Sequence, residues 1–219
     1  MTILLNAIEA RVLGSLIEKE ITTPEYYPLS LNALVNACNQ KNNREPVMQL
    51  NEDEIRQALH RLEDDRLAGP RRGSDDRVTK YEHHLQEVFN FTRGEVAVLC
   101  VLLLRGSQTP GELRSRTERM HRFEELEDVL SALQRLMQRQ PSLVKALPRQ
   151  PGTKEIRYAH LLSDDAESLV ERTHPSNMAA ADISSSSERL CRLETEVARL
   201  QEELAQIKEQ VARITELRQ

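Results

Sequence analysis

Basic side chains beside turn-forming residues are the feature of this sequence that most suggests chemistry. Arg71 and Arg72 lie between Pro70 and Gly73, in a stretch typical of a turn. Guanidinium groups on a turn can reach nucleic-acid phosphates without crowding from a helix, so the pair favours a phosphate contact. The basic residues of the chain fit equally well a solvated surface with weak ion pairs, and the sequence leaves both interpretations open.

A polar run from Asn39 to Glu45 is a second candidate site. Its Asn, Gln, Lys and Arg side chains have the donors and acceptors to read base edges or to contact a partner protein. Asn-rich loops also bond their own backbone, so a purely structural role has equal weight at this stage.

Residues suited to catalysis or metal binding are sparse. His83 and His84 are adjacent, so on a strand they point to opposite faces and cannot share one metal ion. Cys38, Cys100 and Cys191 are far apart and odd in number, which argues against disulfides and a zinc site and predicts reduced thiols. The seven glycines form no phosphate-wrapping motif. We therefore predict a protein that is not an enzyme and uses no cofactor or metal.

Charge is distributed unevenly along the 219 residues, which carry 30 Lys and Arg against 35 Asp and Glu. The overall charge of −5 argues against a uniformly basic nucleic-acid coat. Residues 85–162 have a net charge of +3, whereas residues 1–84 have −3 and residues 163–219 have −5. The middle segment is thus the better candidate for binding an anionic partner.

An internal repeat predicts the elements that position these residues. Asn6 followed by Glu9, and Thr92 followed by Glu95, each have the spacing of a helix capping box. Apolar residues at helical spacing follow both boxes. The repeat predicts a duplicated fold.

Further helices follow in each copy. Ser30 and Thr109 are placed to begin a second helix, and Asn51 to begin the third helix of the first copy. The segment Ala58–Leu62 of that third helix recurs as Ala132–Leu136.

Each third helix is followed by a Pro-, Gly- and charge-rich turn and a short strand, at 78–83 and 156–160. Three helices and a hairpin are typical of a winged helix. The predicted fold is mainly α with small β-hairpins (α+β): two tandem winged-helix domains, 1–85 and 92–162, joined near residues 85–91.

Four segments also carry a family resemblance: Tyr27–Leu34, Ala37–Met48, Arg77–Glu82 and Leu103–Arg116. With them, residues 3–162 resemble the YceH-like family of uncharacterised bacterial proteins. The resemblance implies a tandem winged-helix fold and brings no established activity.

The C-terminal part of the sequence does not continue the repeat. Residues 163–187 are polar and small, which predicts a flexible linker. Residues 188–219 predict a coiled-coil helix that joins copies of the chain into a homo-oligomer, with folding back onto the second domain as the alternative. The predicted seam consists of Leu190, Leu193, Val197, Leu200, Leu204, Ile207, Val211 and Ile214.

We expect a cytoplasmic protein without a membrane segment, because no apolar run approaches the roughly 20 residues that cross a bilayer. The expected function is double-stranded DNA binding or transcription regulation. The alternative is a protein-interaction scaffold that uses the winged-helix surfaces and the coiled coil. The candidate contacts to DNA or to a partner are Lys41, Arg44, Arg56, Arg61, Arg71, Arg72, Arg77, Lys80, Arg114, Arg116, Arg135, Arg139, Arg149 and Lys154.

Overall fold

The computed structural model describes residues 3–71, 78–149 and 155–163. All of them lie in the first of the two units into which the chain divides, Met1–Glu171, and the second unit is Arg172–Gln219. The predicted linker beyond residue 163 and the predicted coiled coil at 188–219, with its seam, lie outside the described residues. So do Arg72, Arg77 and Lys154.

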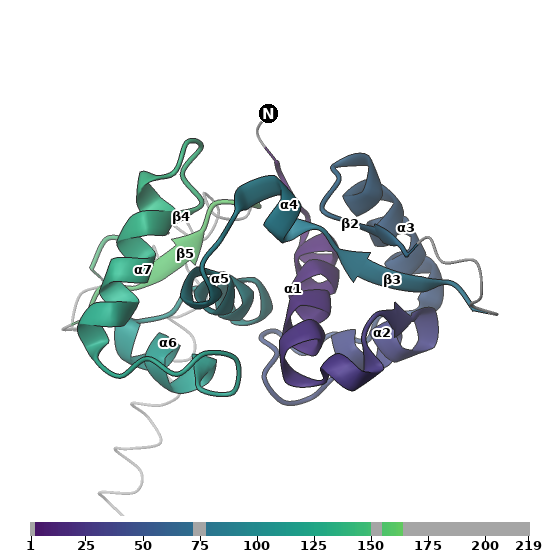
Figure 1. Cartoon of the computed structure of the whole chain (residues 1–219), viewed down its shortest axis with the longest axis horizontal. Coiled ribbons are helices and arrows are strands. Elements are labelled where there is room, and N and C mark those ends of the chain that lie inside the picture. The colour runs from purple at the N-terminus through teal and green to yellow at the C-terminus, as the bar shows by residue number, and fades with distance from the viewer. Residues whose placement is uncertain (1–2, 72–77, 150–154, 164–219) are drawn as a thin grey trace, which may run out of the picture. The chain divides into compact units, whose positions relative to one another are not determined.

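The first half of the described chain (residues 3–85) begins at a capping box, as the sequence predicts. The Asn6 side chain accepts hydrogen bonds from the backbone of Ile8 and Glu9, and the Glu9 side chain accepts one from the Asn6 backbone. Figure 1 shows its elements in purple and blue. They are α1 (Ala7–Thr22), a 3-10 turn (Pro24–Tyr26), β1 (Leu29–Ser30), α2 (Leu31–Cys38), α3 (Glu52–Asp64), β2 (Ala68–Pro70) and β3 (Lys80–His83).

The second half (residues 92–162) begins at the same kind of box, made by Thr92 and Glu95. A short helix, α4 (Leu85–Phe89), occupies the predicted connection between the halves. The elements of the second half are α5 (Arg93–Arg105), α6 (Pro110–Thr117), α7 (Leu126–Gln138), β4 (Val144–Ala146) and β5 (Tyr158–His160).

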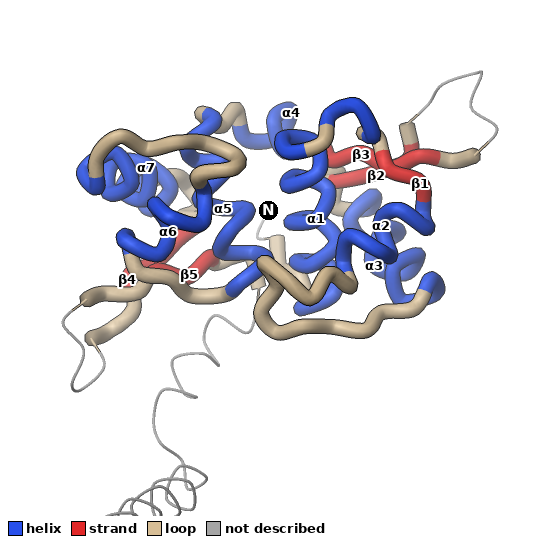
Figure 2. Tube along the Cα trace, turned by 90° about the horizontal axis from the view of Figure 1, so that it is seen from below, coloured by secondary structure: helices blue, strands red, loops and turns tan. Residues whose placement is uncertain are grey.

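The strands make two small antiparallel sheets, drawn in red in Figure 2. In the first sheet β3 lies between β1 and β2, and Leu29 pairs with Tyr81. In the second sheet β4 pairs with β5, and an isolated bridge joins Gln108 to Tyr158. The bridge repeats the β1 pairing just before the following helix, so the two halves share one strand arrangement. The predicted mixed, helix-rich α+β fold is confirmed.

Helices α1 and α5 pack against each other and join the halves in one continuous apolar core. The Cys100 thiol donates to the Gly14 carbonyl, with 3.4 Å between Sγ and O. A Cβ on Gly14 would lie 2.9 Å from Leu104 Cγ, so the helices approach closely only because Gly14 has no side chain. The repeat equates Gly14 with Cys100, and equivalent residues therefore meet, as they do across a two-fold interface.

Candidate nucleic-acid interface

Helices α3 and α7 are the third helices of the two halves, and both turn an apolar stripe to the core. Ile55 and Leu62 on α3 are fully buried, as are Val129 and Leu136 on α7. Each helix also bonds to the residue just before the following strand, because Leu67 N donates to Leu62 O and Leu143 N donates to Leu136 O. The opposite faces of α3 and α7 are therefore the surfaces to compare for DNA contact.

The outer face of α3 is acidic. The helix holds five carboxylates against Arg56 and Arg61. The exposed Arg56 guanidinium lies 3.5 Å from the Glu52 carboxylate, one turn earlier on the same helix. Because DNA phosphates are repelled by such a surface, α3 is poorly suited to a DNA groove.

The outer face of α7 is mostly neutral and polar. Its exposed residues include Ser131, Gln134, Arg135 and Gln138. The only carboxylates on α7, Glu127 and Asp128, lie in the first turn. Arg135 Nε donates to the Ser131 carbonyl at 3.3 Å, which leaves the Nη groups without a partner among the described residues. Amide, hydroxyl and guanidinium groups of this kind can bond to base edges.

Two predicted contacts, Arg61 and Arg139, are instead engaged within the fold. Arg61 Nη1 lies 3.1 Å from Glu9 Oε1, and Arg139 Nη2 lies 3.5 Å from Glu95 Oε2. In both halves, an arginine near the end of the third helix thus pairs with the buried carboxylate that caps the first helix. Arg139 also donates to the carbonyls of Phe89 and Asn90.

The prediction that Arg44 contacts a partner is wrong in this structure, because its side chain is fully buried. Arg44 Nη2 lies 2.6 Å from Glu18 Oε2, and the guanidinium also donates to the Ala37 carbonyl. The neighbouring Arg11 donates to the carbonyls of Cys38 and Pro46. Burial and, to a smaller extent, the Arg44 charge lower the pKa of Arg11. Both arginines therefore hold the chain between α2 and α3 from inside.

The polar run from Asn39 to Glu45 is held in place by these bonds and by its own side chains. Asn39 exchanges two hydrogen bonds of 2.7 Å with the backbone of Leu50. The structural interpretation therefore holds for Asn39. Lys41 stays exposed, with no side-chain partner among the described residues.

One described arginine lies near the start of each strand turn. Arg71 follows β2 and Arg149 follows β4, and both are exposed without a side-chain partner in the described part of the chain. The two turns start in the same register, since Arg71 N donates to Lys80 O and Leu147 N donates to Arg157 O, both at 2.8 Å. The half-buried Lys80 lies on β3 beside its turn.

The remaining predicted residues lie on α6. Arg114 is exposed and donates to the carbonyls of Phe123 and Glu124, which ties the segment before α7 to α6. Arg116 is partly buried, and its Nη2 lies 3.5 Å from Glu112 Oε1. The predicted arginines therefore divide between internal anchors and exposed groups.

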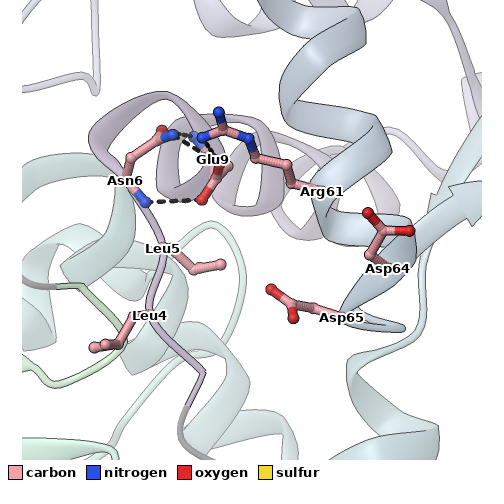
Figure 3. A pocket seen from close by; sticks show the side chains of 7 residues that line it. All are labelled: Leu4, Leu5, Asn6, Glu9, Arg61, Asp64 and Asp65. Carbon is pink, nitrogen blue, oxygen red and sulfur yellow. Dashed lines mark hydrogen bonds and ion pairs between the residues drawn. The ribbon is translucent and has the colours of Figure 1, made fainter.

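A pocket of about 380 Å³ lies between the start of α1 and the end of α3 (Figure 3). Glu9, Asp64 and Asp65 supply carboxylates to its wall, and Arg61 is the basic residue among those that line it. The excess of carboxylates disfavours phosphate there. Sequence reasoning missed this pocket because its residues come from separate helices.

Two of the cysteines, Cys38 and Cys100, are described, and both are buried. Burial raises the pKa of the Cys38 thiol to about 11 and also raises that of Cys100, so neither is a reactive thiolate. Within the described ranges, no group of three or more His, Cys, Asp or Glu side chains is placed to hold a metal ion. The described helices also include none long and apolar enough to cross a membrane.

Most of this chain matches one known protein family. The family described as "Protein of unknown function, DUF480" matches residues 5–153, which include α3 and α7. The chain belongs to the DUF480 family. The predicted resemblance to uncharacterised bacterial proteins is confirmed at this level.

Relatives cover most of the length of this DUF480 chain. A UPF0502 protein of Koribacter versatilis is 57% identical over 198 residues, which cover 90% of each chain. A UPF0502 protein of Geobacter sulfurreducens is 52% identical over 199 residues, again 90% of each chain. One from Opitutus terrae is 55% identical over 159 residues, or 72% of this chain and 69% of its own. These names state no activity.

Proposed function

We propose that the two halves of this DUF480 chain are tandem winged helices and that the second half binds double-stranded DNA. The observation that carries the proposal is the outer face of α7, where Gln134, Arg135 and Gln138 are exposed and carboxylates are confined to the first turn. Third helices of winged-helix proteins enter the major groove, where Gln and Arg side chains bond to base edges.

The turn after β4 supports the same surface. Arg149 is exposed there, and the second half is the segment with the positive net charge. In this arrangement α7 contacts the bases and the turn contacts the phosphate backbone. The first half has an acidic third helix, and in this proposal its role is to pack against the second half and stabilise it.

Fluorescence anisotropy of a random labelled duplex, titrated with the full chain at about 50 mM salt, tests the proposal. We expect binding that weakens steeply with salt. The double variant Arg135→Glu, Arg149→Glu should weaken binding about tenfold or more. It should also reduce the slope of log affinity against log salt concentration by about one to two. The matched control is Arg56→Glu on the outer face of α3, which should change the affinity less than about twofold if α3 stays away from DNA.

Absence of binding at micromolar protein would overturn the DNA proposal. An equal loss in the Arg56→Glu control would also overturn it, because the effect would then follow net charge and not the α7 surface.

A second candidate function, binding of another protein, is favoured by apolar side chains on the flank of α7. Leu126, Leu130 and Met137 are 39%, 38% and 38% exposed. Steps of four and seven residues place them on one side of the helix. Exposed apolar residues that lie together can mark a protein–protein contact.

A crosslinker and a substitution at position 130 distinguish protein binding from DNA binding. A photo-crosslinker at position 130 should capture a protein partner in cells if this flank is an interface, and binding should be reproduced with the purified partner. Leu130→Lys should then abolish that complex while leaving duplex affinity unchanged or higher. Crosslinks absent at 130 would leave DNA binding as the only supported function.

We also propose that residues 188–219 join copies of the chain, so that each assembly presents several α7 surfaces. The support is the heptad spacing of the apolar residues from Leu190 to Ile214. Sedimentation velocity of the full chain should show an oligomer, and Leu200→Glu with Leu204→Glu should give monomers. A monomeric unmodified chain would overturn this proposal.

A further inference from the structure

Three arginines from the second half surround a small pocket where the halves meet. The pocket has a volume of about 40 Å³ and is lined by Arg105, Arg116 and Arg119, together with Glu18 and Asn43 from the first half. A water molecule needs roughly 10–15 Å³ measured in this way, so the space holds about three waters or one small oxyanion. It is too small for a nucleobase or another ring.

The charge inside this arginine pocket is not balanced by its own carboxylate. Glu18 lines the pocket, but its Oε2 already pairs at 2.6 Å with Nη2 of Arg44, which does not line the pocket. Glu112 lies 3.5 Å from Arg116, yet the same residue binds Arg157 at 2.9 Å. Arg119 is exposed and has no partner among the described residues. The lining therefore keeps an excess of positive charge.

Two buried nitrogens also lack acceptors. Arg105 Nε and Arg116 Nη1 are both buried and have no hydrogen-bond partner among the described residues. Among the described residues, the Arg105 side chain makes a single, long hydrogen bond, with 3.4 Å between its Nη1 and Asn43 Oδ1. Burial and then the nearby Arg116 charge lower the pKa of Arg105, and the Glu45 and Glu112 carboxylates oppose this shift without cancelling it. Unpaired buried donors are costly, and an anion that accepts from them would offset that cost.

We propose that the arginine pocket binds a tetrahedral oxyanion of the phosphate class, either free phosphate or the terminal phosphate of a small metabolite. Several guanidinium groups around one small space suit a multiply charged anion, because each can donate to a different oxygen. A singly charged carboxylate would satisfy fewer of these donors. This site is separate from α7 and does not depend on the proposed DNA contact.

Isothermal titration calorimetry of the full chain with sodium phosphate, at constant ionic strength, tests the inference. We expect saturable binding of phosphate, similar binding of sulfate and much weaker binding of acetate. Arg119→Gln should weaken phosphate binding about tenfold or more, because it removes one charge-assisted contact without disturbing a described ion pair.

The matched control is Arg122→Gln. Arg122 is also exposed, lies three residues further along the chain and has only a 3.9 Å contact to Glu124. This variant should change phosphate affinity less than twofold. Arg116→Gln is a second variant, and its unfolding midpoint should be measured beside its affinity so that a loss of fold is not mistaken for a loss of site.

Absence of saturation up to about 10 mM phosphate would overturn the inference, since weaker sites carry no specificity. Equal losses in Arg119→Gln and Arg122→Gln would also overturn it. Competition with a random duplex identifies the source of the anion. If duplex displaces phosphate and Arg119→Gln weakens duplex binding, the pocket receives a backbone phosphate; if neither occurs, it receives a small phosphorylated molecule.

Discussion

Helices α1 and α5 begin with the same capping box and pack against each other, yet their buried side chains differ in kind. α1 buries Arg11 and Glu18. The repeat equates these positions with Ala97 and Leu104 of α5, which are buried and apolar. One helix is thus the centre of a polar network, and the other is an apolar support.

The difference follows from the connections that the two helices must hold. The chain between α2 and α3 is long, and Arg11 and Arg44 bind its carbonyls from inside. The connection between α6 and α7 is shorter and is fastened at its surface by Arg114. The two halves therefore share their order of helices and strands but hold the loop before the third helix by different contacts.

The largest expected effect comes from removing the buried anchor of the first half. Arg44→Ala leaves Glu18 buried without its partner, which should lower the free energy of unfolding by about 3–5 kcal/mol. Arg114→Ala in the second half removes partly solvated bonds and should cost only about 0.5–1.5 kcal/mol. Urea denaturation of both variants measures the difference.

Equal losses for the two variants would contradict the comparison, because the second loop would then depend as strongly on its arginine as the first does. An unchanged slope of free energy against urea in both variants is the control that the denatured state is the same.

Local signals explain why so much of the fold could be predicted from the sequence. The boxes at Asn6 and Thr92 involve residues three apart, so spacing alone predicts where α1 and α5 begin. The recurrence of Ala58–Leu62 likewise predicts that α3 and α7 bury the same stripe.

The candidate site could be predicted less well, because burial depends on partners far away in the chain. Arg44 looks like an exposed loop residue until α1 brings Glu18 to it. The arginine pocket has the same origin, since Asn43 and Arg116 meet only after the halves pack. Residue type predicted positive charge correctly, but only the tertiary contacts separate anchors from free groups.

Two histidines at equivalent strand positions give the next prediction. His83 lies 2.7 Å from the Glu20 carboxylate. In the second half the repeat replaces Glu20 by Gly106, which has no carboxylate to offer His160. His160 Nδ1 accordingly has no partner among the described residues. Burial lowers the pKa of His160 from 6.5 to about 4. The unfolded chain therefore binds more protons between these values, and stability should fall as pH drops from 6.5 to 4, by up to about 3 kcal/mol.

The matched variants are His160→Asn and Glu20→Gln, compared by urea denaturation between pH 7 and pH 3. His160→Asn should flatten the fall above pH 4. The pKa of Glu20 is lowered mainly by its hydrogen bond with His83, so its contribution is present above 4.5 and is lost as pH falls further. Glu20→Gln should therefore change only the acid end. A profile unaffected by His160→Asn would refute the unpaired state of that histidine.

An effect smaller than that of Arg44→Ala tests the interface that the two halves share. Gly14→Ala should lower the free energy of unfolding by about 1–3 kcal/mol, because the new Cβ would meet Leu104 Cγ at 2.9 Å and Leu103 Cβ at 3.2 Å. Gly111→Ala on α6 is the control: its Cβ would have only Thr109 Oγ1 nearby, at 4.0 Å, so helix propensity should leave it neutral or stabilising.

If Gly14→Ala were as harmless as the control, α1 and α5 would have room to separate, and the halves could move as independent domains. A clear loss would instead support the view that the close packing of Gly14 against Leu103 and Leu104 holds both halves as one folding unit. In that case, denaturation of Gly14→Ala should remain a single transition with a lower midpoint, because damage at a shared helix pair is felt by both halves together.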